Sequence, residues 1–178
     1  MDMKRFSLLF ITFILMSFAI QKDLNKKVDK EIKEVFKVSN YTYSAILLSS
    51  EIKKQLPSKF ETDNFIALKA NNALIGYAYM GKAPSKTDAF DYLVLLDKNQ
   101  VILKTKVIAY REDYGGEIGS KRWLQQFIGK KSSDQLRYGD TVVAISGATI
   151  SVRSMTDAMN NLLESLKILQ SKKYCKCN

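Results

Sequence analysis

The sequence predicts an α+β fold, in which helices pack against an antiparallel sheet. Strand-like segments come in one block between residues 65 and 110, and the clearest helical periodicity follows near the C-terminus, at residues 155–169. A block of strands followed by helices is typical of this fold class, whereas alternating strands and helices indicate a parallel sheet. The chain has 178 residues and is 46% apolar, which fits one domain with a sizeable core.

The first twenty residues have the composition of an export signal. Lys4 and Arg5 are followed by an apolar run at residues 6–20. This run is shorter than the roughly 20 residues that span a bilayer. We therefore expect residues 1–19 to be a signal peptide cleaved after Ala19, with a short signal anchor as the alternative. Both predict an extracytoplasmic protein, periplasmic or on the cell surface.

Two helices are expected before the sheet. Residues 23–38 have the periodicity of an amphipathic helix, with lysines and acids opposite an apolar stripe. The stripe consists of Leu24, Val28, Ile32, Val35 and Phe36. Residues 48–60 predict a short helix that is capped by Ser49 or Ser50 and ends before Pro57.

Four segments have the composition of strands: residues 65–70, 73–83, 90–97 and 101–110. The pair Asn71-Asn72 separates the first two, and asparagine is a frequent turn residue. The polar residues 97–100 separate the last two, which predicts a hairpin with a four-residue connection.

The remainder of the chain predicts a loop, a short helix, one more strand and a long helix. Residues 111–121 contain three glycines and predict the loop. Residues 121–130 predict a helix that ends at Gly129, with Trp123, Leu124, Phe127 and Ile128 on its apolar face. We expect a strand at residues 141–145 and a turn at 146–149. The long helix follows from Met155, Ala158, Met159, Leu162, Leu163, Leu166 and Leu169, which recur at intervals of three and four.

The composition excludes several classes of site. The chain has no histidine, which removes Ser-His-Asp and Cys-His catalysis and the usual zinc sites. The net charge of +10 suits a nucleic acid, an anionic membrane or an anionic ligand. The lysines are scattered and no aromatic-basic motif is present, so we expect no nucleic-acid binding. Cys175 and Cys177 lie in a basic tail, residues 171–178, that we expect to be flexible.

The turn at residues 146–149, Ser-Gly-Ala-Thr, has the properties of an anion site. Unpaired N–H groups and about half a positive charge at a helix N-terminus attract anions. Small residues let the backbone approach a phosphate, the Thr149 hydroxyl would face it, and Arg153 would neutralise it. The alternative is an ordinary helix cap by Ser146, Thr149 or Ser151.

The ordered motifs resemble a known family. "ISGATIS" is similar to the flavin-attachment motif of the FMN-binding domain in the Rnf complex G subunit and the sodium-pumping NADH:quinone reductase C subunit. "YREDYGGEIGSKRWLQQFIGK" is similar to the family's Glu- and Gly-rich loop and following helix. The resemblance implies FMN as the cofactor, joined through its phosphate to Thr149 by a flavin transferase that uses FAD and magnesium. Val143 departs from the family pattern, which has an aspartate there, and non-covalent FMN binding is therefore the alternative.

The resemblance also implies roles for neighbouring residues. Ser146, Gly147 and Ala148 would shape the phosphate turn. The loop from Glu112 to Glu117 would approach the flavin, with Gly115 and Gly116 allowing close backbone contact. Tyr114 or Trp123 would pack on the ring system. From the residues alone, two alternatives stay open: Trp123 on an apolar helical face would be a core residue, and Glu112 and Glu117 would be solvated loop acids.

The implied function is electron transfer rather than stand-alone catalysis. The FMN-binding domain would occupy residues 61–170, after a helical lead-in at 20–60. Expected partners are a flavin transferase and membrane redox proteins, as in an Rnf- or Nqr-type subunit, with docking on the membrane surface. A different class remains open: a secreted binding module without flavin.

Overall fold

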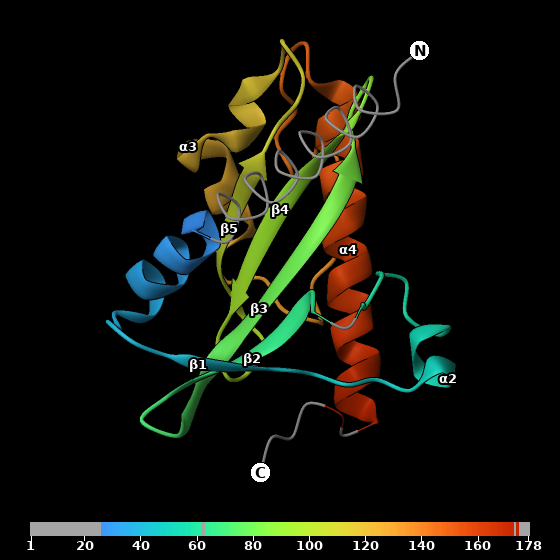
Figure 1. Cartoon of the computed structure of the whole chain (residues 1–178). Coiled ribbons are helices and arrows are strands. Elements are labelled where there is room, and N and C mark those ends of the chain that lie inside the picture. Colours follow the sequence, from blue (N-terminus) through green and yellow to red (C-terminus); the bar gives the residue numbers. More distant parts are fainter. Residues whose placement is uncertain (1–25, 62, 173, 175–178) are drawn as a thin grey trace, which may run out of the picture.

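The computed structural model describes residues 26–61, 63–172 and 174. A five-stranded antiparallel sheet lies between a helix at residues 26–36 and the long helix α4, Thr149–Ser171 (Figure 1). The α+β prediction is therefore confirmed. The expected signal peptide, Cys175 and Cys177 lie outside the described residues. Within the described part, no helix is both long and apolar enough to cross a membrane.

The strands follow one another across the sheet in chain order. They are β1 (Thr42–Ala45), β2 (Phe65–Ala70), β3 (Ala73–Pro84), β4 (Ala89–Leu96) and β5 (Ile102–Ala109). Asn71 and Asn72 have φ values of 50° and 62°, which suits the tight turn that joins β2 to β3. In the next predicted hairpin, the Asp97 carboxylate accepts hydrogen bonds from the N–H groups of Asn99 and Val101, both at 2.8 Å. Both predicted turns are present.

Helix α4 covers one face of the sheet and forms the main core with it. The apolar positions that predicted this helix are buried, apart from Ala158, which is partly buried. They meet large side chains from the strands: Phe65, Tyr77, Phe90 and Leu96 are fully buried. A short helix, α2 (Ser50–Lys53), packs at the edge of this core, and the Ser49 hydroxyl accepts from the Ile52 N–H as predicted.

The helix at residues 26–36 covers the opposite face. Its apolar stripe contacts a second, smaller core, formed by Val28, Ile32, Ile66, Leu68, Ala78, Leu93, Leu95 and Ile108. Glu31, on the buried side of this helix, forms ion pairs with two lysines of β5. They are Lys104 and, at 3.7 Å, Lys106. The predicted amphipathic helix is thus a layer of the domain.

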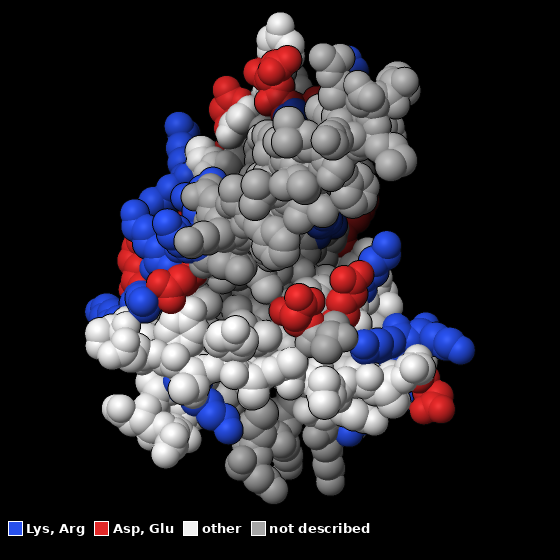
Figure 2. Space-filling view, in the orientation of Figure 1, with Lys and Arg blue, Asp and Glu red and all other residues white. Residues whose placement is uncertain are grey.

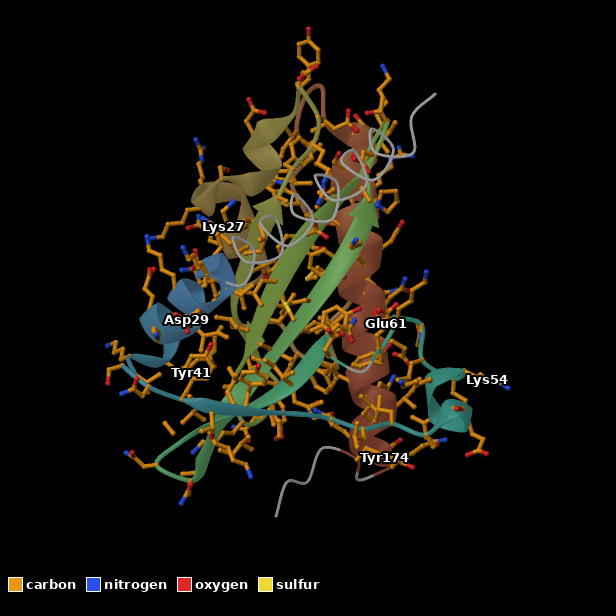
Figure 3. All side chains as sticks on the ribbon, viewed as in Figure 1. Lys27, Asp29, Tyr41, Lys54, Glu61 and Tyr174 are labelled. Carbon is orange, nitrogen blue, oxygen red and sulfur yellow. The ribbon has the colours of Figure 1, made fainter. Side chains whose placement is uncertain are left out.

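The chain after this helix is fixed by Tyr41, whose ring lies close to Asp29 (Figure 3). Burial and the neighbouring Asp29 carboxylate raise the pKa of Tyr41 to about 12. Asp29 also forms an ion pair with Lys33 at 2.9 Å. These contacts direct the chain from the helix into β1, a strand that the sequence did not predict.

The predicted strand at residues 141–145 is wrong. Only an isolated bridge joins Val142 to Tyr138. The Val142 N–H donates to the Arg137 carbonyl at 3.0 Å, and the Val142 carbonyl accepts from the Gly139 N–H at 2.8 Å. The segment therefore closes on itself as a turn and buries Val142 in the core. Its apolar composition reflects this burial and not strand pairing.

Candidate functional site

The glycine-rich loop and the Ser-Gly-Ala-Thr turn meet at the N-terminal end of α4. A Cβ atom added to Gly115 would lie 2.7 Å from the Cβ of Ala148 and 3.1 Å from the Tyr110 hydroxyl. Gly115 has a φ of 78°, in the left-handed region that favours glycine. The two motifs, about thirty residues apart in the sequence, are therefore in direct contact.

Helix α4 begins without a side-chain cap. Its N-cap residue is Ala148, which has no side-chain acceptor. The capping alternative is therefore wrong: Ser146 and Thr149 are exposed, and the Ser151 hydroxyl pairs instead with that of Tyr110 at 3.0 Å. Thr149 is exposed and is the first residue of a 23-residue helix, so it lies beside the uncapped N–H groups and the positive end of the helix dipole.

The first two turns of α4 are held to the sheet by hydroxyl groups. Ser151 is buried and contacts Tyr110, which follows β5. Ser154 donates to the carbonyl of Pro84 at the end of β3. These contacts fix the position of Thr149 relative to the loop. The sequence did not single out these residues, because a buried serine in a helix and a strand-end tyrosine have no distinctive pattern.

Glu112 holds the turn between β3 and β4. Its carboxylate accepts hydrogen bonds from the Ser85 hydroxyl at 2.6 Å, and from the N–H and hydroxyl of Thr87 at 2.7 and 2.9 Å. The hydrogen bonds from Ser85 and from the Thr87 backbone lower the pKa of Glu112 to about 2. Glu112 therefore fixes the start of the glycine-rich loop.

We expect Glu112→Gln to reduce the acid sensitivity of the fold. Because the folded-state pKa is lowered from 4.5 to about 2, the carboxylate stabilises the fold above pH 4.5 and loses this effect as the pH falls towards 2. Urea unfolding at a series of pH values should show a shallower fall in the free energy of unfolding over this range for the variant than for the wild type. Equal slopes would contradict this role.

Trp123 packs in the core, as its apolar helical face predicts. It is 7% exposed and makes an edge-to-face contact with Phe127, with ring centroids 5.2 Å apart. It lies in α3 (Lys121–Leu124), where the Ser120 hydroxyl accepts from its N–H. The Trp123 indole N–H also donates to the Val143 carbonyl at 2.8 Å, and the Gln126 side chain accepts from the Val143 N–H at 2.8 Å. Trp123 and Gln126 thus hold the chain that leads into the turn.

The remaining predicted residues lie on the surface around the turn. Tyr114 is 83% exposed, and Glu117 is also exposed, within a 3₁₀ turn at Gly116–Gly119. The Arg153 guanidinium lies over the Tyr138 ring, 4.7 Å from its centroid. Arg153 is exposed on the second turn of α4, so this contact keeps a positive charge near the helix N-terminus.

Residues 86–164 match the family model of the FMN-binding domain. This segment of the chain is therefore similar to an FMN-binding domain. The matched residues run from the turn before β4 through most of α4 and include both the glycine-rich loop and the Ser-Gly-Ala-Thr turn. The match indicates FMN as the cofactor. A search of curated proteins gave no significant match.

The residues of this segment fit a phosphate group at the turn. A Cβ atom added to Gly147 or Gly116 would meet no atom within 4 Å, so there is open space beside both. Gly147 has a φ of 77°, which lets the chain turn sharply into α4. The turn thus combines open space, uncapped N–H groups and the exposed residue Thr149, an arrangement that suits a phosphate group.

Proposed function

We propose that this flavoprotein is an extracytoplasmic electron carrier whose FMN is joined to Thr149 through a phosphoester bond. One observation carries the proposal: Thr149 is the exposed first residue of an uncapped 23-residue helix, in contact with the glycine-rich loop through Ala148. Bound FMN would supply the one- and two-electron redox chemistry of an electron carrier.

Each residue at the turn has a distinct task in this proposal. The Thr149 oxygen forms a bond to the FMN phosphorus of FAD, the pyrophosphate bond breaks, AMP leaves and the hydroxyl proton passes to solvent. Backbone N–H groups at the start of α4 orient the phosphate. Arg153, above Tyr138, lowers the cost of holding its negative charge. A covalent bond retains the cofactor outside the cell.

Two features of the sequence support the proposed location and partners. The apolar run after Lys4 and Arg5 supports export, and the net charge of +10 supports docking on anionic lipid or on an acidic redox protein. No Gly-x-Gly-x-x-Gly motif follows a strand, so a nicotinamide site is not expected. Electrons would therefore pass between this protein and membrane redox proteins, as in an Rnf- or Nqr-type subunit.

The test is to export the protein from a host that also produces a flavin transferase. We expect a yellow protein, flavin fluorescence that survives a denaturing gel, and reversible bleaching on chemical reduction. Fluorescence lost on denaturation would indicate non-covalent FMN and contradict the tether. A colourless protein that does not bind added FMN would instead support a binding module without flavin.

Val143→Asp is expected to increase the fraction of protein that carries FMN. The Val143 side chain is 65% exposed, while its backbone is fixed by Trp123 and Gln126. An aspartate there would face the solvent, where a transferase could contact it, without disturbing the core. Intact mass spectrometry of wild type and variant, both made with limiting transferase, measures the fraction. An unchanged fraction would indicate that this position does not affect attachment.

A further inference from the structure

Strand β1 forms an edge of the sheet that is unusually open. It pairs with β2 on one side only, in regular register from Thr42 opposite Lys69 to Ala45 opposite Ile66. Proteins commonly protect such edges with charged residues, proline, bulges or a covering segment, because free N–H and C=O groups invite another strand. At the other edge, Ile102 at the start of β5 is covered by backbone hydrogen bonds with Gly129 and Lys130.

The segment around β1 has none of the chemical protections. Residues 39–50 contain no charged residue and no proline, in a chain that is 26% charged. All four β1 side chains are exposed; Tyr43 is 68% exposed, and Leu47, just beyond the strand, is 75% exposed. Figure 2 shows a mostly uncharged area in the lower part of this face, where β1 and the following chain lie in Figure 1. Of the common protections, the described residues supply only the shortness of β1, which has four residues.

The direction of the free backbone groups follows from one hydrogen bond. The Ile46 N–H donates to the Phe65 carbonyl at 3.1 Å. Backbone groups alternate in direction along a strand, so those of Ser44 and Thr42 also face β2. The N–H and C=O groups of Tyr43 and Ala45 then point away from the sheet. None of these four groups has a hydrogen-bond partner among the described residues.

We propose that β1 pairs in antiparallel fashion with β1 of a second copy of this chain, about a two-fold axis at Ser44. This register places Tyr43 opposite Ala45 of the second copy and Ala45 opposite its Tyr43. All four outward groups of each strand are then hydrogen-bonded. On one face of the joined sheet, the large Tyr43 ring lies opposite the small Ala45 methyl group, so the edge is complementary to itself.

The charge distribution favours contact between two copies at this edge over contact between them at other surfaces. Two chains that each carry a net charge of +10 repel one another across most of their surfaces. Residues 39–50 bring no lysine or arginine to the interface, so this edge is a place where two copies can approach closely. The inference does not rest on the proposed electron transfer or on FMN.

Cross-linking tests the register. In a variant with Cys175 and Cys177 replaced by serine, Ser44→Cys places two thiols directly across the axis. Residues in a non-hydrogen-bonded pair have Cα atoms about 4.5 Å apart, within the range for a disulfide. We expect dimers on mild oxidation. Thr42→Cys is the matched control, because its two copies would be roughly 14 Å apart, at about 3.4 Å per residue. No cross-link at Ser44, or an equal yield at Thr42, overturns the proposal.

Charge exchange tests the interface in solution. Ser44→Lys and Ser44→Glu each place like charges across the axis, so each should be monomeric by sedimentation equilibrium, whereas wild type and Ser44→Ala should be dimeric. An equimolar mixture of the lysine and glutamate variants should regain the dimer. If the wild type were monomeric, the proposal would be overturned, and the edge would be available to pair with a strand of a different protein. Dimers that persist in both charged variants would overturn it as well.

Discussion

Thr149→Val is expected to abolish covalent attachment of FMN completely. Valine has nearly the shape of threonine but lacks the hydroxyl oxygen that forms the phosphoester bond. Thr149 is exposed, so the free energy of unfolding should change by less than about 0.5 kcal/mol. In-gel flavin fluorescence after denaturation measures attachment, and urea unfolding measures stability.

Two control variants separate the hydroxyl from its surroundings. Thr149→Ser keeps a hydroxyl at the same position and should retain attachment at a reduced level. Ser146→Ala removes a nearby exposed hydroxyl and should leave attachment in place. If Thr149→Val still carried covalent flavin, or if Ser146→Ala lost it, the tether would have to be assigned to another residue.

Gly115→Ala is expected to destabilise the domain and to displace the turn at the start of α4. A φ of 78° costs an alanine about 1–2 kcal/mol in the left-handed region. The new methyl group would also lie 2.7 Å from the Ala148 Cβ atom, and such overcrowding costs about 1–3 kcal/mol more. Urea unfolding should show both effects as a lower midpoint, and FMN attachment should fall because Ala148 immediately precedes Thr149.

Gly116→Ala is the matched control for this variant. Gly116 is the next residue in the same loop, but its φ lies outside the left-handed region and an added Cβ atom meets nothing within 4 Å. Its stability should be close to that of the wild type. Equal destabilisation by both substitutions would show that the loop tolerates no side chain in general, and would contradict a specific contact between Gly115 and Ala148.

The elements that the sequence predicts well are those with a strong local signal. Three such elements depend on residues close together in the chain. They are helix α4, with its apolar residues at intervals of three and four, the Asn71-Asn72 turn and the Asp97 turn. The error at residues 141–145 has the opposite origin. An apolar run signals burial, and only the hydrogen bonds of Val142 with Arg137 and Gly139 show that it is a turn.

The candidate site was predictable in part for the same reason. The Ser-Gly-Ala-Thr turn and the glycine-rich loop are local motifs, and the structure brings them together through Gly115 and Ala148. The supporting contacts were not predictable, because Glu112 with Ser85 and Tyr110 with Ser151 join distant parts of the chain. Strand β1 escaped prediction because it is only four residues long and all four of its side chains are exposed, so no buried apolar residues mark it in the sequence.

The most direct test of the flavin tether is peptide mass mapping of the protein made together with a flavin transferase. Trypsin cleaves after Arg137 and Arg153, which releases residues 138–153 as one peptide that contains the whole turn. We predict that this peptide carries the mass of FMN less one water, and that fragmentation places it on Thr149. An unmodified peptide, or an adduct on Ser146, Ser151 or any other peptide, would contradict the account.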